Sequence, residues 1–123
     1  MDINRKVGLV VEDSLLIIER ILSLLGEVET IKMVIHAANY KESIKMMKEI
    51  SADIILLDLN LPDRSGIELL KEIKNNHPQI KVIVLTNHAS ENYREICTYM
   101  GADHFFDKSS DFDKIPGTIR AMT

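Results

Sequence analysis

The sequence predicts an α/β protein in which five parallel strands alternate with five helices that cover both faces of the sheet. Short apolar runs rich in valine and isoleucine alternate along the chain with segments whose apolar residues recur every three or four positions. The strand runs are apolar on both faces, so both sides of the sheet need a cover. Parallel neighbours also require a crossover connection, and a crossover helix supplies that cover.

Taken in order, each element has its own signal. The expected strands are residues 7–11, 31–37, 54–57 and 82–85, with a weaker one at 104–106. The expected helices have apolar spacing over residues 15–25, 44–50, 67–73, 96–100 and 115–119. Gly26 should end the first helix, and the Asn-Asn-His-Pro segment at 75–78 should end the third. The five strands and five helices fill residues 1–123. We therefore expect a single domain, with no second domain that would carry an output function.

Composition excludes several classes of protein. The chain has 123 residues and a formal net charge of −4, and Cys97 is its one cysteine, so a disulfide scaffold or a cysteine zinc fold is excluded. The apolar run after the basic N-terminus is too short for a signal peptide, and residues 15–25 are too few to span a membrane. Scattered basic residues argue against direct nucleic-acid binding. We expect a cytoplasmic protein that contacts neither membrane nor nucleic acid.

Chemically active side chains follow four of the expected strands. Glu12 and Asp13 come after the first strand, Asp58 after the third, Thr86 after the fourth and Lys108 after the fifth. In an open parallel α/β sheet, ligands bind beyond the carboxyl ends of the strands. We therefore expect three carboxylates, a hydroxyl and an ammonium group to meet at one edge. Position 107, next to the lysine, is left out of the site.

Three neighbouring carboxylates repel one another unless a cation lies among them. Hard oxygen ligands without histidine or cysteine at the same strand ends favour Mg²⁺, or Mn²⁺, over zinc. With the carboxylate charge shielded, one acid can attack a phosphoryl group while Lys108 and Thr86 contact the transferred oxygens. The arrangement thus predicts formation of an aspartyl phosphate.

Each of these residues also has an ordinary structural interpretation. Asp13, with Ser14, could cap a helix, and Thr86 could do the same for the helix after the fourth strand. Asp58 could simply begin a loop, and Lys108 could be a surface lysine. It is their joint placement, at the ends of four different strands, that favours a site.

Along nearly its whole length the chain resembles the receiver domains of two-component response regulators. The matching motif is Asp58 within DLNLPDRSG, together with the acidic pair, the hydroxyl and the lysine described above. The resemblance implies a doubly wound, flavodoxin-like sheet with strand order 2-1-3-4-5. The roles it implies are metal binding by Glu12, Asp13, Asp58 and the backbone carbonyl of Asn60, phosphoryl acceptance by Asp58, phosphoryl contacts by Lys108 and Thr86, and switching by Thr86 and Phe105.

Three departures from the family pattern stand out. Ser109 occupies a position where many members have proline, so a cis peptide is not expected there. Phe105 stands where tyrosine is often found, which removes a hydroxyl from the switch. Asn87 and His88 are bulky neighbours of the switch hydroxyl, and we expect them to alter the rate of phosphoryl hydrolysis.

The resemblance implies a phosphoacceptor that is not an enzyme beyond, at most, hydrolysis of its own aspartyl phosphate. Its partners would be a sensor histidine kinase or a histidine phosphotransfer protein and a downstream effector protein, with the chain a monomer or a phosphorylation-dependent dimer. The effector surface would include Tyr93, Arg94, Tyr99 and Arg120. One alternative is a receiver-like module that binds partners without phosphorylation. A second alternative is an aspartyl-nucleophile phosphohydrolase, which would need a second acid where this chain has Asn60. A third is a flavodoxin-like cofactor binder, which would need a phosphate-binding loop after the first strand.

Overall fold

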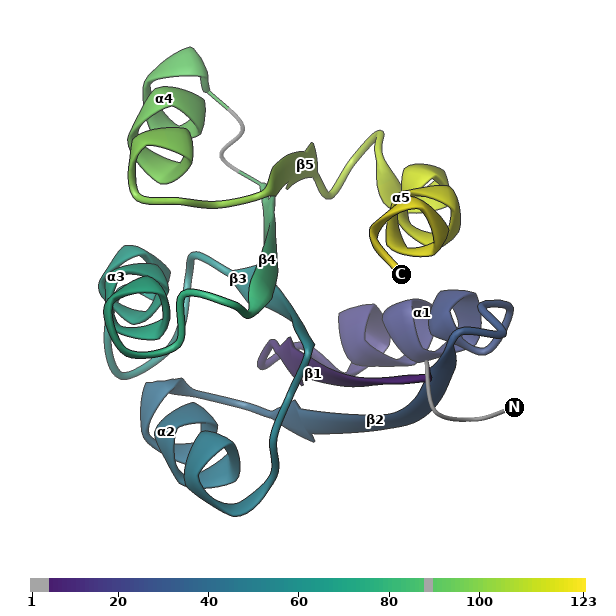
Figure 1. Ribbon diagram of the computed structural model, residues 1–123. Coiled ribbons are helices and arrows are strands. Elements are labelled where there is room, and N and C mark those ends of the chain that lie inside the picture. The colour runs from purple at the N-terminus through teal and green to yellow at the C-terminus, as the bar shows by residue number, and fades with distance from the viewer. Residues whose placement is uncertain (1–4, 88–89) are drawn as a thin grey trace.

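A computed structural model describes residues 5–87 and 90–123 and shows a five-stranded parallel sheet between two layers of helices (Figure 1). The strands are β1 (Lys6–Val11), β2 (Ile31–Ala37), β3 (Ile54–Asp58), β4 (Lys81–Thr86) and β5 (His104–Asp107). The helices are α1 (Leu15–Leu25), α2 (Tyr40–Glu49), α3 (Gly66–Asn76), α4 (Glu91–Tyr99) and α5 (Ile115–Met122), with a 3₁₀ turn η2 (Phe112–Lys114) before α5. The order is β2-β1-β3-β4-β5, which confirms the predicted fold class.

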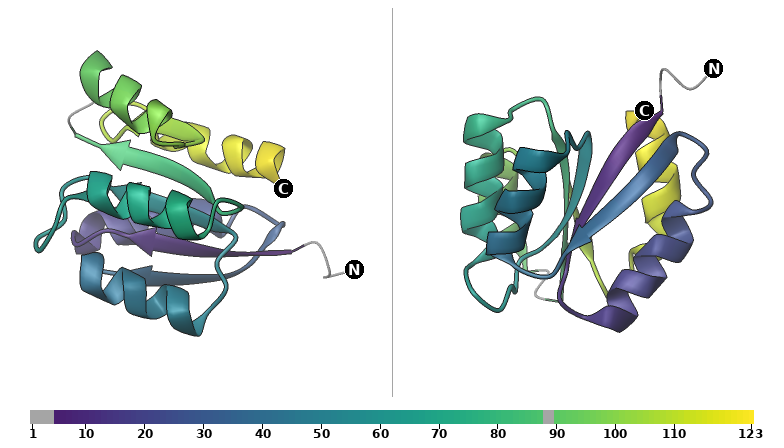
Figure 2. Two further views of the ribbon diagram at one scale, coloured as in Figure 1. Left: turned by 60° about the vertical axis from the view of Figure 1, so that its left-hand side comes forward. Right: turned by 90° about the horizontal axis from the view of Figure 1, so that it is seen from below.

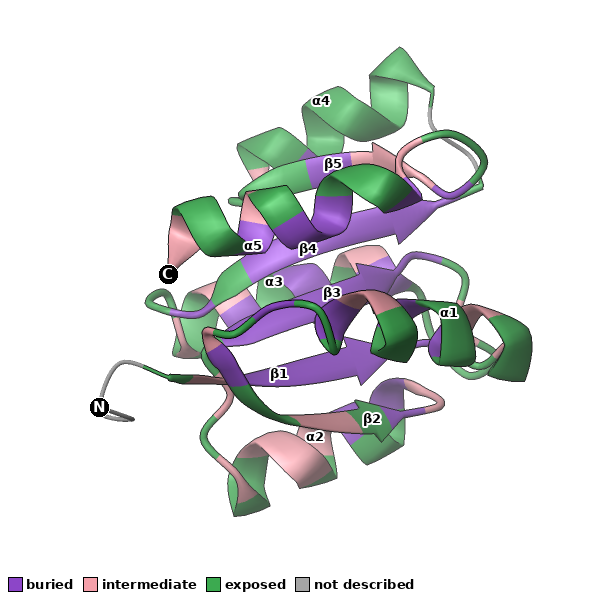
Figure 3. Cartoon of the chain, turned by 90° about the vertical axis from the view of Figure 1, so that its right-hand side faces the viewer, coloured by how far each residue is buried: buried purple, intermediate pink, exposed green. Residues whose placement is uncertain are grey.

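Helices α1 and α5 cover one face of the sheet, and α2, α3 and α4 cover the other (Figure 2). Each face has its own apolar core. On the α1/α5 side, side chains such as Ile21 and Ile119 pack against Leu56 and Ile83 of the central strands. The opposite core contains fully buried residues of α3 and of the other face of the same strands. Figure 3 shows the result, with buried strands at the centre and exposed outer helix surfaces.

The edge strands depart from the expectation of two covered faces. The central strand β3 is buried at every residue, whereas β2 is buried only at its first and last residues. Met33 in β2 is 41% exposed. Apolar periodicity alone does not reveal which strand lies at an edge, and the residues of β2 are apolar enough to suggest a central strand. A smaller difference is Ile50, which was expected in a helix but follows α2 with extended backbone.

The loop between β3 and α3 is fastened to the start of α2. The carboxylate of Asp63 accepts hydrogen bonds from the backbone N–H groups of Tyr40, Lys41 and Arg64, at 2.9, 3.1 and 3.0 Å. The first backbone N–H groups of a helix lack partners within it, so a loop carboxylate is a suitable acceptor. Partial desolvation works against ionisation of Asp63, but these backbone hydrogen bonds outweigh it and lower its pKa.

The same loop closes tightly behind the end of β3. The Gly66 N–H donates to the carbonyl of Leu59 at 2.9 Å, and Asn60 bridges to Ser65. A Cβ atom at position 66 would lie 2.4 Å from the carbonyl oxygen of Asp58 and 2.5 Å from Cα of Leu59. Backbone atoms cannot move aside as a flexible side chain can, so this position requires glycine.

Two further expectations concern the chain as a whole. Within residues 5–87 and 90–123, no helix combines the length and the apolar character that crossing a membrane demands. The described peptide bonds are all trans, including the one between Lys108 and Ser109. This agrees with the absence of proline at that position.

Replacing Gly66 with alanine should lower the free energy of unfolding by roughly 1–3 kcal/mol, because the added methyl group overpacks the loop against the backbone of β3. The control is Gly117→Ala in α5, where a Cβ meets nothing within 4 Å. That change should be neutral or stabilising by up to about 1 kcal/mol, since alanine favours helix. Urea denaturation of both variants measures the difference. Equal effects would contradict the steric argument.

Candidate functional site

The register of the central strands sets the first two carboxylates side by side. Val11 of β1 lies opposite Leu57 of β3 in the parallel ladder. The next residues along these two strands are Glu12 and Asp58, which therefore leave the same edge of the sheet next to each other. Both side chains are buried, with exposed fractions of 2% and 5%.

The same register continues towards β5. Asp58 lies opposite Leu85, so Thr86 is one step further along β4, and Thr86 lies opposite Asp107. Lys108 is the next residue, and its backbone N–H donates to the carbonyl of Thr86 at 3.0 Å. Thr86 and Lys108 are both buried. The sheet thus brings together the four strand ends named by the sequence.

One ammonium group joins the two buried carboxylates. Nζ of Lys108 donates to Oε1 of Glu12 and lies 3.3 Å from Oδ1 of Asp58. Two backbone donors complete the arrangement. The Ser14 N–H donates to Oε2 of Glu12 at 3.0 Å, and the Asn60 N–H donates to Oδ1 of Asp58 at 3.1 Å. Neither of the contacts to Asp58 uses Oδ2.

Burial of Glu12 is the main electrostatic cost at this site. Desolvation raises the pKa of Glu12 above its ordinary value, and the nearby negative charge of Asp58 raises it further. The hydrogen bonds from Lys108 and from the Ser14 N–H oppose that rise without cancelling it. In the described part of the chain, the ammonium group of Lys108 is shared between the Glu12 and Asp58 carboxylates, so added positive charge would be stabilising.

Asp13 adds a third carboxylate at the solvent side. Glu12, Asp13 and Asp58 each offer an oxygen, and these oxygens lie within 4.8 Å of one another. Asp13 is exposed whereas the other two are buried. Helix capping is done by Ser14, whose side chain accepts from the Ile17 N–H. A set of close carboxylate oxygens, open on one side, has the donor chemistry that Mg²⁺ and Mn²⁺ prefer.

The remaining ordinary interpretations do not match the structure. Thr86 is the last residue of β4, and the N-cap of α4 is Ser90. Lys108 is 7% exposed and is not a surface lysine. Asp58 is the final residue of β3 and not the first residue of a loop. Asn60 is exposed and lies two residues beyond it, where the loop begins to turn.

Phe105 is already buried, with 5% of its surface exposed, among the apolar residues that face α3 and α4. Arg94 of α4 covers its ring, with the guanidinium carbon 4.8 Å from the ring centroid. Nη1 of Arg94 also donates to the carbonyl of Phe105 at 3.2 Å. The sequence placed Arg94 on an exposed helix surface but gave no sign of this contact, because the two residues meet only when α4 packs against β5.

The carboxylate of Asp107 is engaged by a residue two positions further along the chain. Its Oδ1 accepts from the N–H of Ser109 at 2.7 Å and from its hydroxyl at 2.6 Å, and these bonds lower the pKa of Asp107. This is consistent with leaving Asp107 out of the site. Asn87 is exposed next to the end of β4, and His88 lies outside the described residues.

Comparison with known proteins gives one consistent family. The model of the response regulator receiver domain matches residues 9–120. The response regulator protein VraR of Staphylococcus epidermidis is 33% identical over 114 residues, which cover 91% of this chain and 54% of VraR. A CheY-like receiver domain protein from Methanospirillum hungatei has a TM-score of 0.86 at 26% identity, covering 96% of this chain and 93% of that one.

A second solved structure, at 20% identity, supports the fold alone. The isolated REC domain of RcsB from Salmonella enterica serovar Typhimurium, in the presence of phosphomimetic BeF₃⁻, has a TM-score of 0.90 and covers 97% of this chain and 88% of that one. Among the curated relatives, the chain spans 28% to 54% of the length of CitT, GacA, VraR and a protein-glutamate methylesterase. It matches one part of each of these proteins.

Replacing Lys108 with methionine should lower the free energy of unfolding by roughly 3–5 kcal/mol in metal-free buffer, because two buried carboxylates lose the ammonium group between them. The matched control is Lys114→Met. The Lys114 ammonium pairs with Asp111 at 2.9 Å, but the lysine side chain is 62% exposed, so stability should hardly change. Urea denaturation with EDTA compares the two. Similar stabilities would contradict the role assigned to the buried lysine.

Proposed function

The chain belongs to the response regulator receiver domain family, and from that membership we propose that it is a phosphoacceptor that takes a phosphoryl group on Asp58. The observation that carries the proposal is the buried contact of Lys108 with both Glu12 and Asp58 at the carboxyl edge of the sheet. A protein that needed only a stable core would gain little from burying two acids there. Transfer of a charged group to one of them explains the arrangement.

In the proposed step, a carboxylate oxygen of Asp58 attacks the phosphorus of the donor. The bond between phosphorus and the donor atom breaks, and its electron pair leaves with the donor. Asp58 reacts as a carboxylate, so it has no proton to lose. The backbone N–H of Asn60 and the ammonium group of Lys108 both contact Oδ1, which orients the carboxylate and supplies positive charge beside the incoming phosphoryl oxygens.

Receiver domains bind Mg²⁺ at an acidic pocket, and the oxygens of this chain suit that ion. Glu12, Asp13, Asp58 and the backbone carbonyl of Asn60 would hold Mg²⁺ or Mn²⁺. When bound, the ion offsets repulsion between these carboxylates and the phosphoryl oxygens. Asp13 is the exposed one of the three carboxylates, so it would be the first that an ion from solvent meets.

Phosphorylation adds close to two negative charges at the end of β3. Lys108, directly after β5, and the buried hydroxyl of Thr86 at the end of β4 are the groups that would respond to it. Because Phe105 is already buried in this structure, the phosphoryl group would act by favouring the buried ring over alternative positions. The surface affected would be that of α4, β5 and α5, and Arg94 joins α4 directly to Phe105.

The phosphoryl donor would be a sensor histidine kinase or a histidine phosphotransfer protein, and the signal would pass to a downstream effector protein. We propose no chemistry on a separate substrate, since the position of a second catalytic acid is held by Asn60. A receiver-like module that only binds partners would have no need of the intact acidic cluster. Labelling with acetyl phosphate distinguishes such a module from a phosphoacceptor.

The wild-type chain should gain one phosphoryl group in mass when incubated with acetyl phosphate and Mg²⁺. The gain should vanish in Asp58→Asn and in wild type treated with EDTA, and it should persist in Asp113→Asn, a matched change at an exposed acid of η2. A gain retained by Asp58→Asn would contradict the assignment. If wild type gains nothing and also fails to bind beryllium fluoride, the partner-only alternative is favoured.

Replacing Thr86 with alanine should leave phosphoryl acceptance intact and weaken its effect on β5. In two-dimensional NMR spectra, beryllium fluoride should shift amide signals of residues 91–107 in wild type and in the exposed control Thr98→Ala. In Thr86→Ala the shifts should stay close to Asp58, because the hydroxyl that links β4 to the phosphoryl group is gone. Shifts as widespread as those of wild type would show that Thr86 does not transmit the change.

A further inference from the structure

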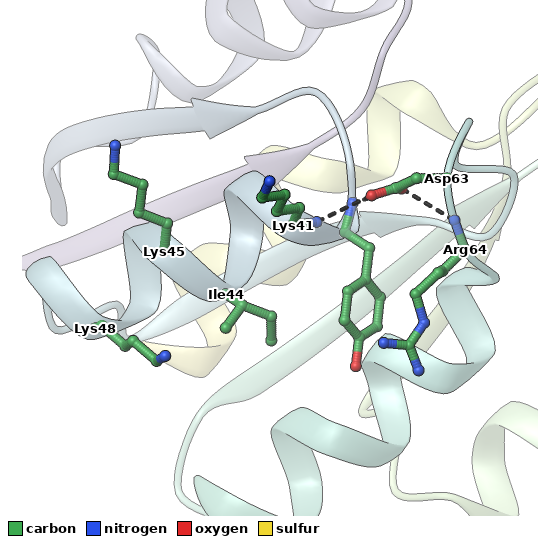
Figure 4. Close-up of a pocket in the computed structure, with 7 residues that line it drawn as sticks. Lys41, Ile44, Lys45, Lys48, Asp63 and Arg64 are labelled. Atoms are coloured by element: carbon green, nitrogen blue, oxygen red, sulfur yellow. Dashed lines mark hydrogen bonds between the residues drawn. The ribbon is translucent and has the colours of Figure 1, made fainter.

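A groove on the outer surface of α2 lies outside the site described above. Its volume is about 680 Å³. We call it the α2 groove, and α2 contributes Tyr40, Lys41, Ile44, Lys45 and Lys48 to its lining. Asp63 and Arg64, from the loop after β3, close one end (Figure 4). Its floor is largely apolar, formed by Ile44, by Tyr40 and by the aliphatic parts of the lysine side chains.

Two carboxylates near the groove, those of Asp63 and Glu68, are already engaged. Asp63 accepts three backbone N–H bonds, including those of Tyr40 and Lys41. Glu68 accepts two hydrogen bonds from Arg64, at 2.7 and 3.0 Å, and the Arg64 guanidinium lies 4.1 Å from the centroid of the Tyr40 ring. The guanidinium covers one face of that ring and Tyr40 is only 9% exposed, so little of the ring is open to stacking by an aromatic ligand.

The lysines of α2 are not engaged in this way. Among residues 5–87 and 90–123, no carboxylate lies within ion-pair distance of the ammonium groups of Lys41, Lys45 or Lys48. The acidic residues of α2, Glu42 and Glu49, are not part of the lining. A local excess of positive charge therefore lies on a chain whose net charge is −4.

The spacing of these lysines suits a long occupant. They stand four and then three residues apart, so they follow one side of the helix over roughly 10 Å. Figure 4 shows the side chains of Lys45 and Lys48 spread apart along α2, with Ile44 beside them, and not converging on one point. A single phosphate would require converging donors, whereas an elongated acidic segment matches a row of separated cations.

We propose that the α2 groove binds an acidic amphipathic helix of another protein. An apolar side chain of that helix would pack on Ile44, and carboxylates one helical turn away on either side would pair with Lys45, Lys48 and Lys41. This goes beyond phosphoryl transfer, since none of the groove residues belongs to the acidic cluster. Attraction between exposed charges is screened by salt, so binding should weaken as ionic strength rises.

The test uses fluorescence anisotropy with a labelled, alanine-based helical peptide that carries a central leucine and a glutamate one turn to either side. Its control peptide has glutamine in place of each glutamate. The protein variants are Lys45→Gln/Lys48→Gln and the matched pair Lys32→Gln/Lys81→Gln, which removes the same charge from exposed lysines of β2 and β4. Thermal melts and acetyl phosphate labelling of both variants check that the fold and Asp58 are unaffected.

The acidic peptide should bind wild type and the Lys32/Lys81 variant equally, and the Lys45/Lys48 variant roughly 2- to 30-fold more weakly, as expected for the loss of two exposed ion pairs. Equal binding of the glutamine peptide would overturn the proposal, and so would equal weakening by both variants. The peptide could also be displaced by pyrophosphate but not by sodium chloride of the same ionic strength. That result would overturn the proposal in favour of a small phosphate ligand. Sedimentation showing self-association that the Lys45/Lys48 variant abolishes would assign the groove to a second copy of this chain.

Discussion

Two carboxylates buried at one edge of the sheet, with one ammonium group between them, constrain much of this structure. Glu12 and Asp58 could not both leave water without a nearby positive charge, and Lys108 provides it from the end of β5, which it directly follows. Neighbouring strands lie about 4.8 Å apart, so β5 is roughly 10 Å from β3. A long side chain is needed to cross β4, and the order β2-β1-β3-β4-β5 places lysine where its reach suffices.

The loop after Asp58 connects this cluster to the rest of the molecule. At its far end it turns back on β3 so closely that Gly66 has no room for a side chain. Midway, Asp63 is fixed to the first turn of α2 and Arg64 covers Tyr40. The acidic cluster and the α2 groove therefore share one short segment of chain, although they open on different parts of the surface.

Much of the fold and the positions of the site residues could be predicted because parallel strands place their carboxyl ends together. The sequence could not decide between Asp13 and Ser14 as helix cap, since both residue types favour that position. It could not show that Arg94 covers Phe105 or that Arg64 covers Tyr40, because both contacts depend on how separate elements pack. The exposure of β2 was missed because apolar content does not distinguish an edge strand from a central one.

The contact between Glu12 and Lys108 joins residues 96 positions apart. During synthesis from the N-terminus, both acids leave the ribosome before the lysine that neutralises them. Until Lys108 follows, closing the edge of β1 and β3 would bury like charges together, which opposes early compaction of that edge. Completion of the sheet by β5 thus coincides with completion of the charge cluster, and contacts between residues this far apart in the sequence slow folding.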